Sequence, residues 1–324
     1  MSLENKRILV TGAAGFIGSN LTEKLLNLGA SVIGIDNLFN GRLENLEGAF
    51  NNKNFQFHKG DIRDFSFLLD VFNDIDIIFH EAAFTSVPQS VLMPESCNDV
   101  NVNGTLNVLN AARKKDVEKV VFASSSGVYG DTPTLPKKEN MPRVPISPYG
   151  VAKLACESYM QAFHHVYGLN TLSLRYFNVF GPRQRDSPYS GVIAIWLGRL
   201  IKNKNLIIFG DGNQSRDFTY IKDVIHANIL AAAENECSGE IINIGANSPI
   251  KLIDLAKLML KLTNKEDLEI IFDPPRPGDI IHSFADISKA KEVLKFQPKY
   301  NQEQGLRDYL KWYNKKYRTN LEIK

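Results

Sequence analysis

Tyr149 and Lys153 have the residue types and the spacing of a proton-transfer pair. They lie four positions apart in an apolar run that starts at Pro148, and residues four apart share one face of a helix. A tyrosine pKa of about 10 makes a poor base near neutral pH, but a nearby cation can lower it by roughly 1–3 units. Ser125 is the third residue that we expect at this site. Such pairs also occur on solvated helices, so the surrounding elements decide between the two interpretations.

A glycine-rich turn precedes these residues in the chain. Residues 7–11 have the composition of a short buried strand, Gly12, Gly15 and Gly18 follow it, and a helix is expected over 19–28. Glycines there allow a tight turn and close approach of a pyrophosphate, which then lies at the positive end of the helix. The spacing is GxxGxxG, whereas GxGxxG is commoner. The turn therefore predicts a dinucleotide site.

Asp36 indicates which dinucleotide is bound. It ends a second expected strand, 31–35, about twenty residues beyond the middle glycine, where a carboxylate accepts hydrogen bonds from the adenosine ribose. An acidic group at that place repels the extra phosphate of NADP, so we expect NAD. Oxidised nicotinamide is itself cationic and could contribute to lowering the pKa of Tyr149.

Length and composition fit a large enzyme and exclude several other classes. The chain has 324 residues, of which 44% are hydrophobic and 23% charged, enough for a sizeable core and two lobes. The net charge is +2 without a basic stripe, so no nucleic-acid partner is expected. No apolar segment approaches the roughly 18 residues that cross a bilayer. We expect a cytoplasmic protein that does not interact with membranes.

Metal binding is not expected. Cys97, Cys156 and Cys237 are odd in number and far apart, with neither disulfide-framework nor zinc spacing. A helix would splay the adjacent pair His164–His165 apart, and the other histidines are isolated.

Alternating strands and helices in the first half predict a Rossmann-type α/β fold, a doubly wound parallel sheet of six strands. Further strands are expected over 55–58, 76–80, 119–123 and 171–176, and helices over 65–72, 100–115 and 149–166. We place this NAD-binding domain at residues 1–178. Residues 179–324 are expected to form mainly a smaller α/β substrate-binding lobe, with some segments able to return to the first domain. Polar residues at the strand ends should then converge on one crevice.

Motifs along nearly the whole chain resemble the extended short-chain dehydrogenase/reductases that modify nucleotide sugars, and within them the UDP-hexose 4-epimerases. The motifs are TGAAGFIGS (11–19), GDI (60–62), NVNGT (101–105), SSSGVYG (124–130), SPYGVAK (147–153), RYFNVFGPRQ (175–184), SRDFTYIKDV (215–224) and RPGDI (276–280).

This resemblance implies an NAD site that runs along the strand ends. Its residues are Gly12, Gly15, Phe16, Ile17 and Gly18 at the pyrophosphate, Asp36, Asn37, Asn40 and Gly41 around the adenosine ribose, Asp61 and Ile62 at the adenine, Ala82, Ala83 and Asn101 along the channel, and Tyr149, Lys153, Tyr176 and Phe177 toward the nicotinamide.

The resemblance also implies a UDP-sugar site. Its residues are Asn178 and Arg216 at the diphosphate, Ile207 and Phe209 at the uracil, Arg276 and Asp279 at the phosphate and ribose, and Ser86, Ser125, Ser126, Tyr149, Gln184, Val192 and Ser283 in the rest of the substrate site. Arginine suits phosphate because its planar fork donates two hydrogen bonds at once.

The implied reaction inverts a secondary alcohol through a transient ketone. The sugar C4 is oxidised by hydride transfer to NAD while Tyr149 takes the hydroxyl proton, with Ser125 as the catalytic hydrogen-bonding partner and Lys153 beside them. The 4-keto sugar then swings about its diphosphate and is reduced on its other face.

Other members of this family remain open as alternatives. Nucleotide-sugar dehydratases have an acidic pair, and UDP-glucuronate decarboxylases a glutamate, where this chain has Ser126 and Gly127. A UDP-glucuronate epimerase, another sugar epimerase and a non-catalytic NAD-binding regulator are the further alternatives.

Ser283 is the residue that bears on which sugar is used. By resemblance it faces the C2 substituent of the hexose, where enzymes restricted to UDP-glucose and UDP-galactose have tyrosine. Serine leaves room for an N-acetyl group, so UDP-GlcNAc and UDP-GalNAc are the expected substrates. Thr85, and one residue fewer between Gln184 and Val192, depart from the most selective relatives. Relatives also lead us to expect a homodimer that packs helices 100–115 and 149–166 of each subunit.

Overall fold

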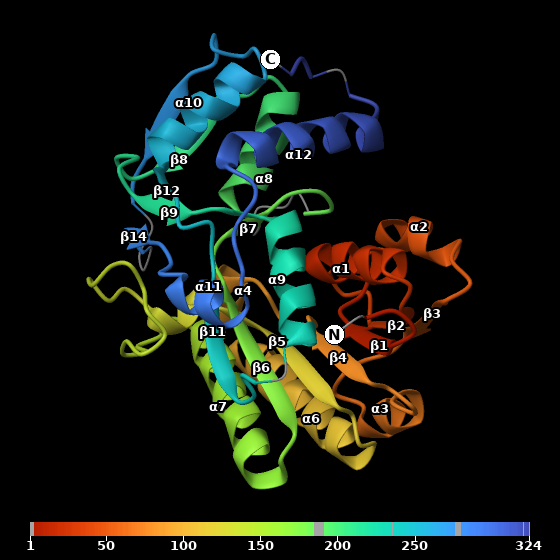
Figure 1. Cartoon of the computed structure of the whole chain (residues 1–324). Coiled ribbons are helices and arrows are strands. Elements are labelled where there is room, and N and C mark those ends of the chain that lie inside the picture. Colours follow the sequence, from red (N-terminus) through yellow and green to blue (C-terminus); the bar gives the residue numbers. More distant parts are fainter. Residues whose placement is uncertain (1–2, 185–190, 235, 276–279, 320, 324) are drawn as a thin grey trace.

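The computed structural model describes residues 3–184, 191–234, 236–275, 280–319 and 321–323. A central sheet of seven parallel strands has the order β11-β6-β5-β4-β1-β2-β3 (Figure 1). Its strands are β1 (Arg7–Thr11), β2 (Ser31–Asp36), β3 (Phe55–Lys59), β4 (Ile77–His80), β5 (Lys119–Ser125), β6 (Asn170–Tyr176) and β11 (Glu240–Ile244).

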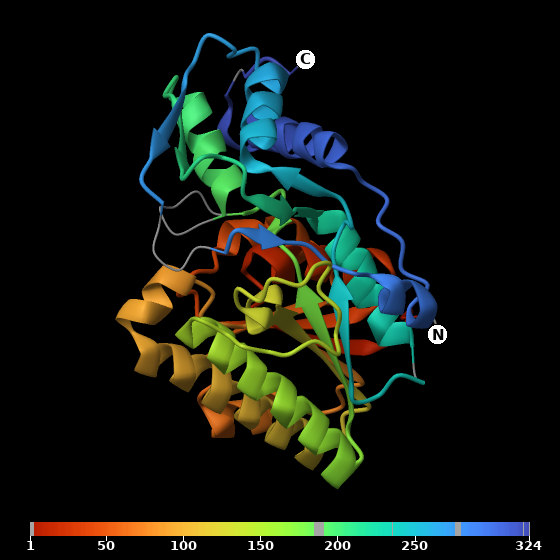
Figure 2. The same ribbon diagram turned by 90° about the vertical axis from the view of Figure 1, so that its left-hand side faces the viewer.

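Helices cover both faces of this sheet. The main ones are α1 (Phe16–Asn27), α2 (Glu47–Phe50) and α9 (Ile221–Ala233) on one face, and α3 (Phe65–Val71), α6 (Gly104–Lys114) and α7 (Pro148–Tyr167) on the other (Figures 1 and 2). Shorter helical segments are η1 (Leu43–Leu46), α4 (Val87–Leu92), α5 (Pro94–Asn98), η2 (Asp99–Asn103) and η3 (Ser126–Tyr129).

Alternating side chains of the strands explain the two layers. In β1, Ile8 and Val10 belong to the core beneath α1, whereas Leu9 belongs to the core beneath α3 and α6, and all three are fully buried. Successive strand residues point to opposite faces, so a strand covered on both sides must be apolar throughout. The unbroken apolar runs in the sequence therefore become central strands.

The direction of the chain across the sheet reverses between β1 and β4. The chain runs from β1 outward to β3 and then returns to place β4 on the other side of β1. Ligands of such sheets bind beyond the carboxyl ends of the strands at this reversal. The turn after β1 and the residues after β4 and β5 therefore border the expected site.

The second lobe consists mainly of helices and small sheets. Its elements are α8 (Val192–Ile201), α10 (Leu252–Leu262), α11 (Ser288–Val293), α12 (Gln302–Tyr317) and the strands β7 (Val179–Phe180), β8 (Leu206–Phe209), β9 (Ser215–Asp217), β10 (Thr219–Tyr220), β12 (Pro249–Lys251), β13 (Ile270–Asp273) and β14 (His282–Ser283). The strands pair as β10-β7, β12-β9-β14 and β13-β8. In Figure 1, α8, α10 and α12 lie together at the end of the molecule beyond the sheet.

The predicted Rossmann fold is confirmed, with one strand more than the six expected. The additional strand, β11, pairs with β6, and α9 packs against α1, so two segments beyond residue 179 return to the first domain. The boundary at residue 178 stays a prediction. In the described part of the chain no helix is long and apolar enough to cross a membrane.

Candidate active site

Helix α7 sets the position of Tyr149 and Lys153. The Ser147 hydroxyl caps the helix by accepting a hydrogen bond from the Gly150 N–H at 3.1 Å, and Pro148 occupies the first turn, where its missing N–H costs nothing. Tyr149 is the second residue of the helix. Lys153 follows one turn later with its Nζ 5.9 Å from the centre of the Tyr149 ring.

The three expected catalytic residues lie together at the end of β5. Ser125 is the last residue of that strand, and its hydroxyl accepts a hydrogen bond from the Gly127 N–H at 3.1 Å. A Cβ on Gly127 would lie 3.3 Å from this hydroxyl and 3.8 Å from the Tyr149 ring, so the two side chains are neighbours. The Lys153 Nζ donates to the Ala123 carbonyl at 2.6 Å, and Lys153 is almost completely buried. One strand and one helix thus place a hydroxyl, a phenol and an ammonium side by side.

Burial controls the pKa values of this group. It raises the pKa of Tyr149 to about 12, against which the hydrogen bond from Ser125 acts in the lowering direction. Burial also lowers the pKa of Lys153. The lowered tyrosine pKa expected from the spacing is therefore not produced by the residues of this chain, because desolvation of the phenolate outweighs the favourable contacts. Ionisation of Tyr149 depends on positive charge that a bound cofactor brings.

The glycine turn has the shape of a phosphate cradle. Gly12 has φ of 69° and a Cβ there would lie 2.8 Å from the Ala82 nitrogen, while a Cβ on Gly18 would overlap the Gly12 carbonyl oxygen. Helix α1 begins at Phe16 after Gly15, without a side-chain cap. Its first N–H groups and the positive end of its dipole are available to an anion.

The expected adenosine end lies at β2 and β3. The Asp36 carboxylate accepts hydrogen bonds from the N–H groups of Ala14 at 2.9 Å and Leu38 at 2.8 Å, and it packs against Gly41. Burial raises the pKa of Asp36. Asp61 accepts from Asn37 at 2.8 Å.

Neighbouring residues complete this end. Arg63, which the sequence did not single out, donates to Asp61 and holds the pKa of that carboxyl well below its usual range. Ile62 is buried and Asn40 is exposed.

Residues after β4 and β6 form the middle of the site. The Ala82 N–H donates to the Thr11 hydroxyl at 3.2 Å, and Ala83 follows it. Asn101 accepts from the Phe84 N–H at 2.7 Å and donates to the Phe84 carbonyl at 3.1 Å, which fixes this loop. Tyr176 and Phe177, both buried, lie at the end of β6.

Several expected substrate residues meet in the second lobe. Ser283 on β14 lies opposite Arg216 on β9 in the parallel register, and Ser283 is buried. The Arg216 guanidinium donates to the carbonyls of Ser215 and Ile281, both at 3.0 Å. Asn178 donates to the Asp217 carbonyl at 3.3 Å. Ser283, which is expected beside the sugar, and the expected diphosphate contacts Arg216 and Asn178 therefore lie on neighbouring backbone segments.

The remaining expected substrate residues are distributed over both lobes. Ser86 caps α4 and Ser126 begins η3, while Val192 begins α8 and Ile207 and Phe209 lie on β8. Gln184 donates to the Val179 carbonyl at 3.2 Å. Arg276 and Asp279 lie outside the described residues.

Sequence reasoning missed a buried ion pair and a half-buried carboxyl group next to the expected site. Arg175 and Glu157 form an ion pair in which both side chains are fully buried. Glu81, directly before Ala82, contacts Tyr176. The only sequence signal for each was a charged residue inside an apolar run.

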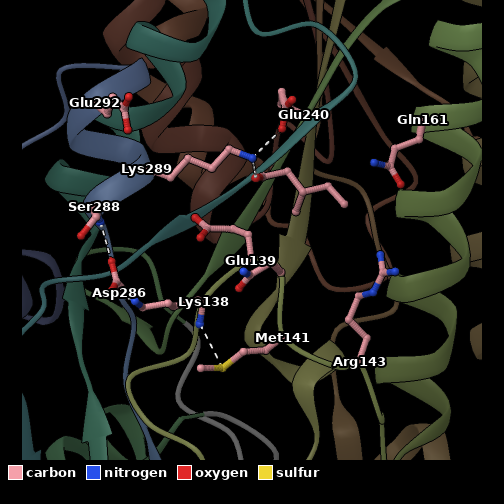
Figure 3. A pocket seen from close by; sticks show the side chains of 12 residues that line it. Lys138, Glu139, Met141, Arg143, Gln161, Glu240, Asp286, Ser288, Lys289 and Glu292 are labelled. Atoms are coloured by element: carbon pink, nitrogen blue, oxygen red, sulfur yellow. Dashed lines mark hydrogen bonds and ion pairs between the residues drawn. The ribbon is translucent and has the colours of Figure 1, made fainter.

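A separate pocket of about 480 Å³ contains none of the expected site residues (Figure 3). It lies between the 138–143 segment, α7, β11 and α11. Acidic and basic side chains both line it, and Lys289 pairs with Glu240 across one side. Because charges of both signs pair within it, the pocket does not indicate a ligand of one charge. Among the described residues, no group of three or more side chains is placed to hold a metal ion.

Comparison with known proteins agrees with this geometry. The model of the NAD dependent epimerase/dehydratase family matches residues 8–245. A UDP-glucose 4-epimerase of Mycolicibacterium smegmatis is 39% identical over 96% of this chain and 99% of its own. A UDP-glucuronate 4-epimerase of Thermodesulfobacterium geofontis is 35% identical over 97% of each chain.

A solved structure gives the same fold. It is the UDP-N-acetylglucosamine 4-epimerase of Methanobrevibacter ruminantium M1 in complex with UDP-N-acetylmuramic acid, with a TM-score of 0.92 and 38% identity over 97% of this chain and 99% of that one. These three relatives act on different sugars at similar identity, so similarity alone does not choose between the sugars.

Proposed function

Because the chain belongs to the NAD dependent epimerase/dehydratase family, we propose that it is a UDP-hexose 4-epimerase that interconverts UDP-GlcNAc and UDP-GalNAc. UDP-glucose and UDP-galactose are proposed as further substrates. The observation that carries the reaction type is that Ser125 and Tyr149 lie together at the end of β5 beside buried Lys153. Epimerisation at C4 needs one group that removes a hydroxyl proton and later returns it, and this arrangement provides it.

The residues present fit NAD. The cradle at Gly12 and Gly18 leaves no room for a Cβ, as a turn that a pyrophosphate approaches closely requires. We propose that Asp36 binds the adenosine ribose and Lys153 the nicotinamide ribose. When bound, NAD supplies reversible hydride transfer at the sugar C4.

In this mechanism the protein moves one proton. Tyr149 accepts the proton of the C4 hydroxyl, and Ser125 hydrogen-bonds the same oxygen. Lys153 favours the ionised form of Tyr149 by its charge. After the 4-keto sugar has turned its other face to the cofactor, Tyr149 returns the proton, so no net oxidation results. Such proton transfer typically contributes about 10²–10⁴-fold to the rate.

Ser283 supports the N-acetylated sugars. Ser283 lies on β14 beside Arg216. By resemblance, enzymes restricted to plain hexoses have the larger tyrosine at this position, so serine would leave space for an N-acetyl group. An amide in a closed pocket needs hydrogen-bond partners, since leaving it unpaired costs about 1–3 kcal/mol. We propose Ser126 and Gln184 as those partners.

The alternatives differ in what they require. A dehydratase or decarboxylase needs an acid at the position of Gly127, where a Cβ would lie 3.3 Å from the Ser125 hydroxyl and no carboxylate is present. A UDP-glucuronate epimerase uses the same proton relay and differs only in the sugar. A non-catalytic regulator would not need to retain Tyr149 and Lys153.

Replacing Tyr149 tests the reaction. Tyr149→Phe should lower turnover of UDP-GlcNAc by about 10²–10⁴-fold with UDP-sugar affinity changed only a few-fold, because the hydroxyl acts mainly in the transition state. UDP-GalNAc formation is measured by chromatography without added NADH. Tyr317→Phe, at an exposed tyrosine on α12, is the matched control. Unchanged turnover in Tyr149→Phe contradicts the assignment.

Replacing Ser283 tests the sugar. Ser283→Tyr should abolish activity on UDP-GlcNAc while UDP-glucose and UDP-galactose are still interconverted, and Ser283→Ala, which keeps the space, should retain both activities. If the wild-type protein epimerises UDP-galactose but not UDP-GlcNAc at millimolar concentration, the sugar assignment is wrong. Conversion of UDP-glucuronate alone would favour the glucuronate epimerase.

We further propose a cytoplasmic homodimer that packs through α7. Exposed apolar side chains on this helix include Val151, Tyr159, Val166 and Tyr167, whereas α6 shows no large exposed apolar side chain. Burial of such residues against a second copy removes apolar surface from water. Light scattering that gives a monomer at micromolar concentration would reject the dimer.

A further inference from the structure

Glu81 lies in the candidate active site, but its carboxyl group has no role in the proposed proton transfer. It follows β4 directly, and its N–H donates to the Thr11 carbonyl at 3.3 Å, next to the glycine turn. Its Oε1 accepts a hydrogen bond from the Tyr176 hydroxyl at 3.0 Å. Its other oxygen, Oε2, is buried and has no hydrogen-bond partner among the residues that the structure describes.

A buried carboxyl oxygen without a partner favours the binding of a donor. In the unfolded chain water supplies a hydrogen bond to this oxygen, and folding forfeits that bond unless a donor replaces it. Among the described residues, the hydrogen bonds of the neighbouring donors go to other acceptors. Asn228 donates to the Tyr176 hydroxyl at 2.8 Å and to the Val224 carbonyl at 2.9 Å. Lys153 donates to the Ala123 carbonyl at 2.6 Å.

A hydrogen bond with Tyr176 on β6 holds the side chain of Glu81 in position. The Tyr176 hydroxyl on β6 lies 3.0 Å from Oε1, and it lies 2.8 and 3.0 Å from the amide nitrogen and oxygen of Asn228 on α9, so the amide positions the phenol that contacts Glu81. These contacts fix the direction of the carboxyl plane. A carboxyl group oriented in this way can present Oε2 to a ligand with little loss of side-chain entropy.

The position along the sheet identifies which end of the cofactor is near. The adenosine residues Asp36 and Asp61 follow β2 and β3, on the other side of β1. Glu81 follows β4, beside β5 with Ser125, and its charge acts on both Tyr149 and Lys153. The nicotinamide end therefore faces Glu81. By resemblance the ribose at that end is bound by Lys153, and the carboxamide amine is a further donor at that end.

We propose that Glu81 binds the nicotinamide carboxamide of NAD, with Oε2 accepting a hydrogen bond from the carboxamide amine. This role orients the nicotinamide ring relative to Tyr149. The inference rests on NAD binding in this site and not on which sugar is epimerised.

The test measures binding and not turnover. The full-length protein, freed of co-purified nucleotide, is titrated calorimetrically with NAD, ADP-ribose, which lacks nicotinamide, and 3-acetylpyridine adenine dinucleotide, in which a methyl group replaces the amine. Wild-type protein should bind NAD about 5- to 150-fold more tightly than the acetylpyridine analogue, the range expected for one unpaired buried group. This first comparison needs no variant.

Glu81→Gln then shows which residue is responsible. It keeps the size of the side chain and an acceptor for Tyr176, but places an amide donor toward the ligand. NAD affinity should fall by about 5- to 150-fold, ADP-ribose affinity should stay within about two-fold, and the discrimination against the acetylpyridine analogue should disappear. Glu95→Gln, an exposed glutamate on α5, is the matched control.

Three results would overturn the proposal. They are equal binding of NAD and the analogue by the wild-type protein, equal weakening of NAD and ADP-ribose in Glu81→Gln, and unchanged discrimination in that variant. Tyr176→Phe keeps the carboxyl and should retain part of the discrimination. If Tyr176→Phe abolishes discrimination and Glu81→Gln does not, Tyr176 is the ligand instead. Since every readout is a dissociation constant, failure of the proposed epimerase activity leaves the test intact.

Discussion

Removing one partner of the buried pair Glu157–Arg175 should be the most damaging single change near the site. The Arg175 Nε and Nη2 donate to the two carboxylate oxygens of Glu157 at 2.8 and 2.7 Å, and neither side chain is exposed. Ser124 also donates to Glu157 at 2.5 Å, and Arg175 donates to the Tyr129 hydroxyl at 2.7 Å. The network joins β5, α7 and β6, the elements that carry Ser125, Tyr149 and Tyr176.

The magnitude follows from what each variant leaves behind. Arg175→Met fills much of the same volume but leaves the Glu157 carboxylate with Ser124 as its remaining side-chain donor in the network described above. An uncompensated buried charge of this kind typically costs about 3–5 kcal/mol of the free energy of unfolding. Replacing both residues, in Arg175→Met/Glu157→Leu, removes the charge as well and should cost less than Arg175→Met alone.

Urea denaturation followed by circular dichroism measures these differences. Lys222→Met removes one partner of the largely exposed pair Lys222–Asp308 and should cost no more than about 1 kcal/mol. The prediction is wrong if Arg175→Met lowers the free energy of unfolding by less than about 1 kcal/mol. It is also wrong if the double variant loses as much as Arg175→Met and Glu157→Leu lose together. Turnover measured under folded conditions shows whether displacement of α7 also weakens the proton relay.

Two further predictions concern charge at the cofactor site. Asp36→Ala should weaken NAD binding and reduce discrimination against NADP, which titration with both nucleotides measures; tighter NADP binding by the wild-type protein would show that this acid was misinterpreted. Burial raises the pKa of Glu81 to about 7 from 4.5, against the opposing charge of Lys153. The folded protein then holds a proton that the unfolded chain releases. In nucleotide-free protein, stability should therefore fall by up to about 3 kcal/mol between pH 4.5 and 7 and level off above, and Glu81→Gln should remove this contribution.

The sequence predicted the first lobe well because its signals are local. Buried strands read as unbroken apolar runs, and β1, β2 and β5 begin where the composition placed them. β11 was missed as a member of the sheet, because its pairing with β6 joins segments distant in the sequence and no local pattern encodes that. The helix expected from residue 100 is part of a longer run, α5, η2 and α6, that begins at Pro94.

For the candidate site, the sequence spacing predicted which side chains lie close together but not how deeply they are buried. The helical interval placed Lys153 beside Tyr149, and the strand end placed Ser125 there as well. Burial raises the pKa of Tyr149 in the protein without cofactor, and spacing did not predict this contribution because it depends on tertiary packing. Glu81 was missed because its importance depends on one buried carboxyl oxygen, which only tertiary packing reveals.

The residues proposed for proton transfer and for sugar selection lie in different lobes, which bears on how substrate choice could change while the chemistry is kept. The proposed proton relay lies on β5 and α7 of the central sheet, whereas the proposed sugar gate, Ser283, lies on β14 of the second lobe. Asp217 holds that lobe together by accepting hydrogen bonds from the N–H groups of residues 246, 247, 248 and 285, at 3.1, 3.1, 3.4 and 3.3 Å. A backbone fixed from three segments keeps Arg216, the neighbour of Asp217, in register with Ser283. A side-chain change at Ser283 therefore alters the space around the sugar without moving Tyr149, and we infer that selection can adjust sugar preference independently of the proton relay.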